Sequence, residues 1–446
     1  KDYLEIFNHP AHKKKIEALM VNVFQVTSKY NEAYAVLNAI HLPTHSQQKA
    51  LQQLSFFLGV KAYNVSDYKA ASEYFEQSAA CNINTEFLYL SSFWLADCYY
   101  KLNNYDKAIS YYTDLPIVSL KSLKKYNDLQ YYNLAYSYFQ KGNYKLSNQY
   151  FRQFEKIVTD SMKANDAYLR IADGFFMLNE YSLSERYYKK AISYALFDVD
   201  YASYKRSVVL GLMNRNSAKV KLLKQFVADY PQSAYLDNAL YDLAKYYKDK
   251  SDASMALNYY NQLIDVTMDQ QFVADAHLSK GMIHFNVDSV GKAITEFLVV
   301  VNNHKKSVYF KEALSGLQSA YMSQAKINEY FAIIEALPEE SVSKAEQDSL
   351  TYSAAFMKFT EGSYTVARDA FNKYLSKYEN GVFVSDASYY YAKSCLELGD
   401  TLSVVEVFDK ISAKNLKHNK EATLFLARYY YAKEHFMLSN FYYQKV

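Results

Sequence analysis

The stretch FWLADCYYKLNNYDKAISYY, residues 93–112, decides the fold. Its first half carries Ala96, and its second half carries Ala108 and Tyr112, four positions apart and therefore on one face of a helix. Between the halves stands Asn103-Asn104, and asparagine is one of the few residues that tolerate the left-handed backbone of a helix stop. The stretch therefore predicts two helices joined by a tight turn.

A small residue followed four positions later by an aromatic recurs along the chain with a period near 37 residues. The pairs are Ala71/Phe75, Ala108/Tyr112, Ser147/Phe151, Ser184/Tyr188, Ala256/Tyr260, Ala293/Phe297, Ala367/Phe371, Val404/Phe408 and Ser439/Tyr443, where only Val404 is not small. Twelve residues before each pair stands Gly59, Ala96, Ala135, Ala172, Ala244, Gly281, Ala355, Ala392 or Ala427. Antiparallel helices approach closely only where small side chains face each other, and aromatic rings fill the space beside that contact. The pattern predicts an all-α array of helix–turn–helix repeats.

The composition favours the same fold. The 446 residues include only 10 Gly and 5 Pro, against averages of roughly 7% and 5%, so we expect helices joined by short turns. Half of the residues are hydrophobic, which is enough for a continuous core. The 48 tyrosines suit half-buried helices, because the ring packs inward and the hydroxyl reaches water. A base-composition bias of the genome is the alternative explanation for their number.

Charge and reactive side chains exclude several classes of function. The 50 Lys+Arg are balanced by 47 Asp+Glu without a basic stripe, so we expect no nucleic-acid partner. Cys98 and Cys395 are expected to pack as small hydrophobic residues. His277 and His284 stand seven residues apart, too far along one helix to share a metal ion. No catalytic motif is present, and we expect no enzyme activity, catalytic residue, metal or cofactor.

The repeats resemble the tetratricopeptide repeat (TPR) family over almost the whole chain. Gly59 and Ala71 stand at the family's small positions, and Tyr99 and Phe75 stand at its aromatic positions. The resemblance implies a right-handed α-solenoid of about a dozen repeats. The chain departs from the family in its longer period and in Trp94, which lies off the family's tryptophan position.

We expect one solenoid over residues 1–446, in which two units have lost the small–aromatic pattern. The predicted segments are a divergent N-terminal unit at 1–50, regular repeats at 51–197, a degenerate unit at 198–232, regular repeats at 233–306, a degenerate unit at 307–338, and regular repeats at 339–446 with the last one truncated. Val21, Ala33 and Leu37 suggest the N-terminal unit, and Pro338 marks the end of the second degenerate unit. Because the chain opens on Lys1 rather than Met, we expect the natural protein to extend further.

The resemblance also implies a concave groove, lined by the first helix of each repeat, in which a protein or peptide partner binds. The candidate groove residues are Phe56, Tyr63, Phe93, Tyr100, Tyr132, Tyr136, Phe139 and Phe176. An aromatic row would suit an extended or helical peptide. The alternative is that some of these rings pack against the neighbouring repeat. The lysine and asparagine with which chaperone-tail TPR domains clamp a terminal carboxylate are missing here.

Two functional interpretations stay open. Residues 54–154 are similar to the long TPR arrays of Bacteroidetes, which implies a non-catalytic protein–protein interaction scaffold of the bacterial cell envelope. This interpretation places the protein in the periplasm or at the outer membrane, without a transmembrane segment in this chain, and would fit a lipid anchor outside it. The alternative is a cytoplasmic adaptor or regulator whose effector domain lies outside this chain.

Overall fold

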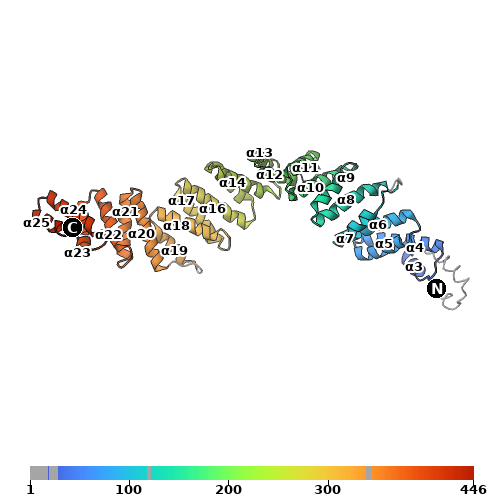
Figure 1. Cartoon of the computed structure of the whole chain (residues 1–446), viewed down its shortest axis with the longest axis horizontal. Coiled ribbons are helices and arrows are strands. Elements are labelled where there is room, and N and C mark those ends of the chain that lie inside the picture. Colours follow the sequence, from blue (N-terminus) through green and yellow to red (C-terminus); the bar gives the residue numbers. More distant parts are fainter. Residues whose placement is uncertain (1–18, 20–28, 118–121, 338–342) are drawn as a thin grey trace. The chain divides into compact units, whose positions relative to one another are not determined.

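The computed structural model describes residue 19 and residues 29–117, 122–337 and 343–446 (Figure 1). These residues form 23 helices and, within the same ranges, no strand. The chain divides into two compact units, Lys1–Leu236 and Asp237–Val446. Successive helices pack on one another within each unit, so the all-α repeat solenoid predicted from the sequence is confirmed.

The first unit is a series of antiparallel helix pairs preceded by a single described helix. Its helices are α3 (Tyr30–Asn38), α4 (His45–Asn64), α5 (Tyr68–Cys81), α6 (Thr85–Lys101), α7 (Tyr105–Asp114), α8 (Lys124–Gln140), α9 (Tyr144–Phe154), α10 (Ser161–Met177), α11 (Tyr181–Tyr194), α12 (Val199–Leu212) and α13 (Asn216–Asp229). The degenerate stretch at 198–232 thus still forms a helix pair, α12 and α13. Ala33 and Leu37 are buried in α3, whereas Val21 lies outside the described residues.

The second unit continues with the same kind of helix pair. Its helices are α14 (Leu236–Asp249), α15 (Ala253–Val266), α16 (Gln270–Asn286), α17 (Val290–Asn303), α18 (Phe310–Ser323), α19 (Ile327–Glu335), α20 (Lys344–Thr360), α21 (Tyr364–Lys377), α22 (Val384–Glu397), α23 (Thr401–Ala413), α24 (Asn419–Ala432) and α25 (Phe436–Tyr443). The second degenerate stretch forms α18 and α19, and Pro338 at its end lies outside the described residues.

The turns between paired helices have the backbone that their sequence predicts. Asn103 and Gly142 adopt positive φ angles of 59° and 73°, which stop α6 and α8. The next residue in each turn caps the following helix: the Asn104 side chain accepts a hydrogen bond from the amide of Lys107. One residue therefore ends a helix and its neighbour begins the next, which keeps the turns short.

The small–aromatic pattern forms the core between the helices of each pair. All nine small residues of the first helices are buried, and the aromatic partners from Phe75 to Phe408 are at most 2% exposed. The last pair is an exception, because Tyr443 is 47% exposed and Tyr442 is buried in its place. The Tyr442 ring stacks on Tyr430 and its hydroxyl donates to Asp409, which turns α25 one residue away from the expected register.

The cysteines differ in burial, and this predicts their reactivity. Cys98 and Cys395 are fully buried, as expected, and burial raises the pKa of the Cys98 thiol to about 12. Cys81 is partly exposed. Because the thiolate is the reacting form, we expect a disulfide reagent to label only Cys81 in the folded protein and all three cysteines in denaturant. Mass spectrometry of the labelled peptides measures this, and equal labelling of Cys98 in both states would contradict its burial.

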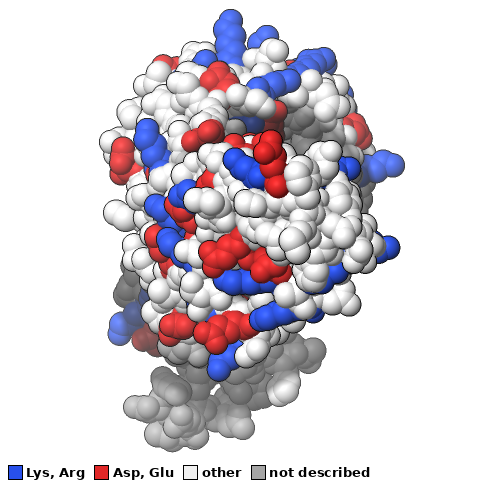
Figure 2. All heavy atoms as spheres, turned by 90° about the vertical axis from the view of Figure 1, so that its left-hand side faces the viewer, with Lys and Arg blue, Asp and Glu red and all other residues white. Residues whose placement is uncertain are grey.

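The surface has no strongly charged region on the face that Figure 2 shows, where basic and acidic side chains are interspersed. Within the described ranges, no helix is both long and apolar enough to cross a membrane. The same residues contain no group of three His, Cys, Asp or Glu side chains that could hold a metal ion. His277 instead contacts Glu296, with 2.6 Å between Nδ1 and Oε2.

Some first helices of successive pairs contact each other directly. In the first unit α4 contacts α6 and α6 contacts α8, and contacts between successive second helices are sparser. Elements on the inner side of a curved array are the ones that crowd together. The sequence predicts the groove along α4, α6, α8 and α10, and the contacts among α4, α6 and α8 agree with an inner position for these three helices.

Candidate functional site

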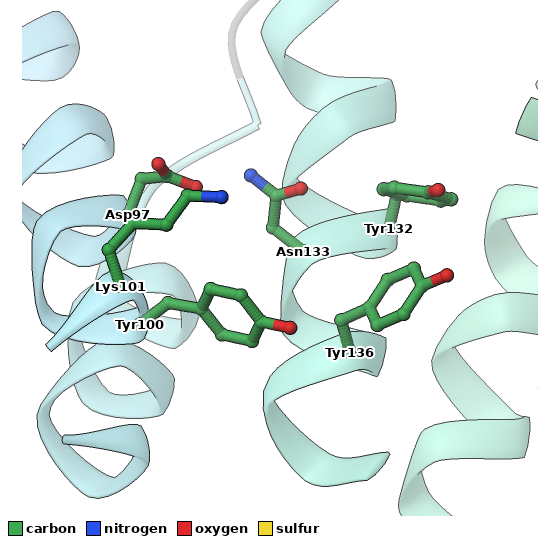
Figure 3. Close-up of a pocket in the computed structure, with 6 residues that line it drawn as sticks. All are labelled: Asp97, Tyr100, Lys101, Tyr132, Asn133 and Tyr136. Carbon is green, nitrogen blue, oxygen red and sulfur yellow. The ribbon is translucent and has the colours of Figure 1, made fainter. Parts of the chain in front are cut away.

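A hollow of about 200 Å³ opens between α6 and α8 (Figure 3). It is lined by Asp97, Tyr100, Lys101, Tyr132, Asn133 and Tyr136. The lining residues recur at intervals of three or four within each helix, so each helix turns one face towards the hollow. Sites that enclose small molecules usually have roughly 300–1,000 Å³. The size of the hollow therefore suits one side chain of a partner protein.

Tyrosine hydroxyls on this face donate to aspartates of the following helix pair. The Tyr63 hydroxyl of α4 donates to Asp97 of α6. The Tyr132 hydroxyl of α8 lies 2.6 Å from Oδ2 of Asp166 in α10, and the Tyr136 hydroxyl donates to the same oxygen. In Figure 3 the Tyr132 and Tyr136 side chains extend from α8 on the side away from α6. These bonds connect α4 to α6 and α8 to α10.

The same bond recurs in the second unit at the same separation in sequence. The Tyr241 hydroxyl lies 2.6 Å from Oδ2 of Asp275, and the two residues are 34 positions apart. Tyr63 and Asp97 are also 34 apart, as are Tyr132 and Asp166. A tyrosine–aspartate pair thus connects adjacent repeats in both units.

Arg170 of α10 lies between two carboxylates on this face. Its Nη1 is 2.8 Å from Oδ2 of Asp173, and its Nε is 3.7 Å from Oδ1 of Asp166. Oδ1 of Asp173 also accepts hydrogen bonds from the hydroxyls of Tyr188 and Tyr201, each at 2.6 Å. One nearly buried carboxylate therefore joins α10 to α11 and to α12.

Burial and these carboxylates keep the tyrosines protonated. Desolvation is the largest cause that raises the pKa of Tyr63, Tyr132 and Tyr136, and the charges of Asp97 and Asp166 raise it further. Each hydroxyl is therefore neutral near pH 7 and acts as a donor to its aspartate.

Two of the eight predicted groove residues lie in the core. Phe56 and Phe93 are 9% and 2% exposed. The Phe56 ring lies 5.2 Å from that of Phe87, and the Phe93 ring lies 5.0 Å from that of Tyr126 in the following helix pair. These two rings therefore pack against neighbouring helices, which is the alternative to a place in the groove.

The other six predicted residues are partly exposed, and the structure brings three of them to one place. Tyr100, Tyr132 and Tyr136 line the hollow (Figure 3). Three lie outside its lining: Tyr63 packs edge-on against Trp94, Phe139 against Tyr144, and Phe176 lies 5.3 Å from Nζ of Lys205.

The eight predicted groove residues are all aromatic and do not include the polar residues of the hollow or their partners. Asp97, Lys101 and Asn133 line it beside the tyrosines, and Asp166 holds two of the hydroxyls. A signal was present in the sequence, because tyrosine and aspartate recur 34 residues apart, close to one repeat. An aspartate at that distance from an inner-face tyrosine is a candidate acceptor.

Two segments match the family described as tetratricopeptide repeat, residues 91–116 and residues 131–157. They contain all six residues that line the hollow. The chain is a tetratricopeptide repeat protein. No curated protein matches this TPR chain in sequence.

Solved TPR structures resemble this TPR protein over part of its length. The C-terminal part of a TPR repeat-containing protein from Cytophaga hutchinsonii is 14% identical, with a TM-score of 0.42, and the similarity covers 58% of this chain and 98% of that chain. A TPR protein from Parabacteroides merdae is 12% identical, with a TM-score of 0.36, over 59% of this chain and 98% of that one. PilW, a type IV pilus biogenesis factor, is 13% identical, with a TM-score of 0.33, over 51% of this chain and 98% of that one.

Proposed function

We propose that this TPR protein is a non-catalytic scaffold that binds a segment of another protein along the inner face of its first helices. TPR arrays are in general interaction scaffolds rather than enzymes. The observation that carries the proposal is the cluster of partly exposed rings at the hollow, Tyr100, Tyr132 and Tyr136. Tyrosine rings offer a large rigid contact area at a low cost in side-chain entropy, and they are enriched among residues that dominate binding energy.

We further propose that the scaffold belongs to an assembly of the bacterial cell envelope. The resemblance of residues 54–154 to Bacteroidetes arrays supports this location. Fractionation of native cells with an antibody against the protein tests it. Recovery in the membrane and periplasmic fractions is the expected result, and recovery in the cytoplasm alone would favour an adaptor role.

Removing the inner-face rings should abolish partner binding. We expect the triple variant Tyr100→Ala, Tyr136→Ala, Phe139→Ala to weaken capture of native partners by roughly 100-fold or more, because rings that dominate an interface contribute about 2 kcal/mol or more each. Affinity capture from native cells, quantified by mass spectrometry against the wild-type chain, measures the loss. Circular dichroism establishes that the variant remains helical.

The matched control removes two rings that lie away from the hollow. Tyr111 stacks on Tyr99 at 5.6 Å and Tyr150 stacks on Tyr138 at 5.5 Å, and none of these rings lines the hollow. The double variant Tyr111→Ala, Tyr150→Ala should keep the partners. Equal loss in both variants, or unfolding of the triple variant, would show that the inner rings act in the core instead.

A further inference from the structure

Four tyrosines in and near the hollow donate their hydroxyl protons to aspartates of the protein. Tyr63 and Tyr112 donate to Asp97, and Tyr132 and Tyr136 donate to Asp166. A phenol has one proton and two acceptor lone pairs. The partly exposed Asp97 carboxylate and the ring of Tyr100 are what the hollow offers to a partner, and a carboxylate beside an aromatic ring favours a group that donates hydrogen bonds.

Asp97 adds a negative charge to the hollow, and Lys101, four residues further along α6, lines the hollow as well. Its two oxygens accept hydrogen bonds from the Tyr63 and Tyr112 hydroxyls, and no Lys, Arg or His nitrogen in the described ranges lies within 4.0 Å of them. Asp166, on the next first helix, differs because Arg170 is its ion-pair partner. The hollow thus contains a carboxylate without an ion-pair partner within 4.0 Å among the described residues, beside the Tyr100 ring.

We propose that this hollow binds a basic side chain of the partner segment, with arginine favoured over lysine. This inference rests on the proposed scaffold function and specifies which side chain of the partner the groove recognises. A guanidinium group in the hollow would lie against the ring of Tyr100 and donate to the Asp97 carboxylate. Arginine fits better because its planar group stacks on rings while its N–H groups remain directed at a carboxylate. The volume of about 200 Å³ holds such a side chain and little more.

Lys101 allows a test of whether the hollow prefers a positively or a negatively charged partner group. It lines the hollow with an exposed side chain, and its Nζ lies 5.8 Å from the centroid of the Tyr100 ring. A partner cation would be repelled by this ammonium group, whereas a partner carboxylate would be attracted to it. Removing the charge of Lys101 should therefore strengthen binding of a basic partner and weaken binding of an acidic one.

The experiment uses capped peptides of alternating leucine and serine that differ only at one central residue: arginine, citrulline or glutamate. Citrulline has the shape of arginine without its charge. Trp94, the only tryptophan, packs against Tyr63 one turn from Asp97, so its fluorescence reports binding near the hollow. We expect the arginine peptide to bind the wild-type chain about tenfold more tightly than the citrulline peptide, and the glutamate peptide to bind most weakly.

Two variants assign the preference to the hollow. Asp97→Asn keeps an acceptor for the tyrosine hydroxyls and should bring the arginine peptide to the affinity of the citrulline peptide, whose own affinity should not change. Lys101→Met keeps the aliphatic stem and should strengthen arginine binding severalfold. The emission spectrum of Trp94 without peptide should be the same in all three proteins, which shows that the helix pair is intact.

Several outcomes would overturn the inference. They are tighter binding of the glutamate peptide, weaker arginine binding by Lys101→Met, an unchanged arginine-to-citrulline ratio in Asp97→Asn, and no binding of the arginine peptide at millimolar concentration. The three peptides could also bind equally well to the wild-type chain and not at all to the triple variant of Tyr100, Tyr136 and Phe139. That result would contradict the preference for a basic side chain but would leave the scaffold function in place. Loss of native partners from the capture experiment remains the separate test of that function.

Discussion

Replacing Phe297 with alanine is expected to destabilise the Asp237–Val446 unit by about 3–5 kcal/mol. The ring is 1% exposed and lies between α16 and α18. Two glycines face it: a β-carbon added at Gly281 would lie 2.5 Å from Phe297 Cε1, and one added at Gly316 would lie 2.7 Å from Cζ. The ring thus fills the space that both glycines leave, and its removal opens a cavity that no neighbouring side chain can close.

Chemical unfolding followed by circular dichroism measures this loss as a lower denaturant midpoint. Hydrogen exchange should show the loss of protection first in α16, α17 and α18, because stability in a repeat array is local to neighbouring repeats. The matched control is Phe436→Ala, since Phe436 is 59% exposed, and its effect should stay within about 0.5 kcal/mol. Equal midpoints for the two variants would contradict the packing described for Phe297.

Replacing Asp173 with alanine is expected to destabilise the Lys1–Leu236 unit by about 3 kcal/mol, because it removes a nearly buried carboxylate that accepts from Arg170, Tyr188 and Tyr201. Asp173 is 8% exposed. Without it, Arg170 keeps only the more distant Asp166, at 3.7 Å. The hydroxyls of Tyr188 and Tyr201 also lose their acceptor, and Tyr188 is fully buried. Each buried donor that is left without an acceptor and that water cannot reach destabilises the fold by roughly 1–3 kcal/mol.

Thermal unfolding of the full chain, with hydrogen exchange in α10, α11 and α12, measures the effect of Asp173→Ala. The control is Asp106→Ala, because the Asp106 side chain is 81% exposed in its ion pair with Lys141, and exposed pairs contribute about 0–1 kcal/mol. A second variant separates the charge from the hydroxyl bonds: Arg170→Met combined with Asp173→Ala should cost less than the two single changes added together. Strict additivity would mean that the two side chains do not act as a pair.

The repeat and its turns could be predicted from the sequence because both depend on neighbours within the same helix pair. The small residue of a first helix and the aromatic of its second helix are separated by one tight turn, so their spacing determines which faces meet. Asn103 and Gly142 adopt the left-handed backbone because of their own residue types: glycine has no β-carbon, and the short polar side chain of asparagine tolerates this conformation. At α25 this local rule is insufficient, since contacts with Tyr430 and Asp409 decide that Tyr442 and not Tyr443 is buried.

The site depends on contacts between repeats, and one sequence period does not contain them. Phe93 and Tyr100 occupy the same inner face of α6, but the following helix pair covers Phe93 and leaves Tyr100 beside the hollow. Which hydroxyl meets which carboxylate depends likewise on the offset between one first helix and the next, as for Tyr132 and Asp166. The sequence by itself therefore determined the repeat, its register before α25 and the aromatic face. The tertiary structure decided which rings remain accessible and which aspartate meets a tyrosine hydroxyl, because packing between helices sets both.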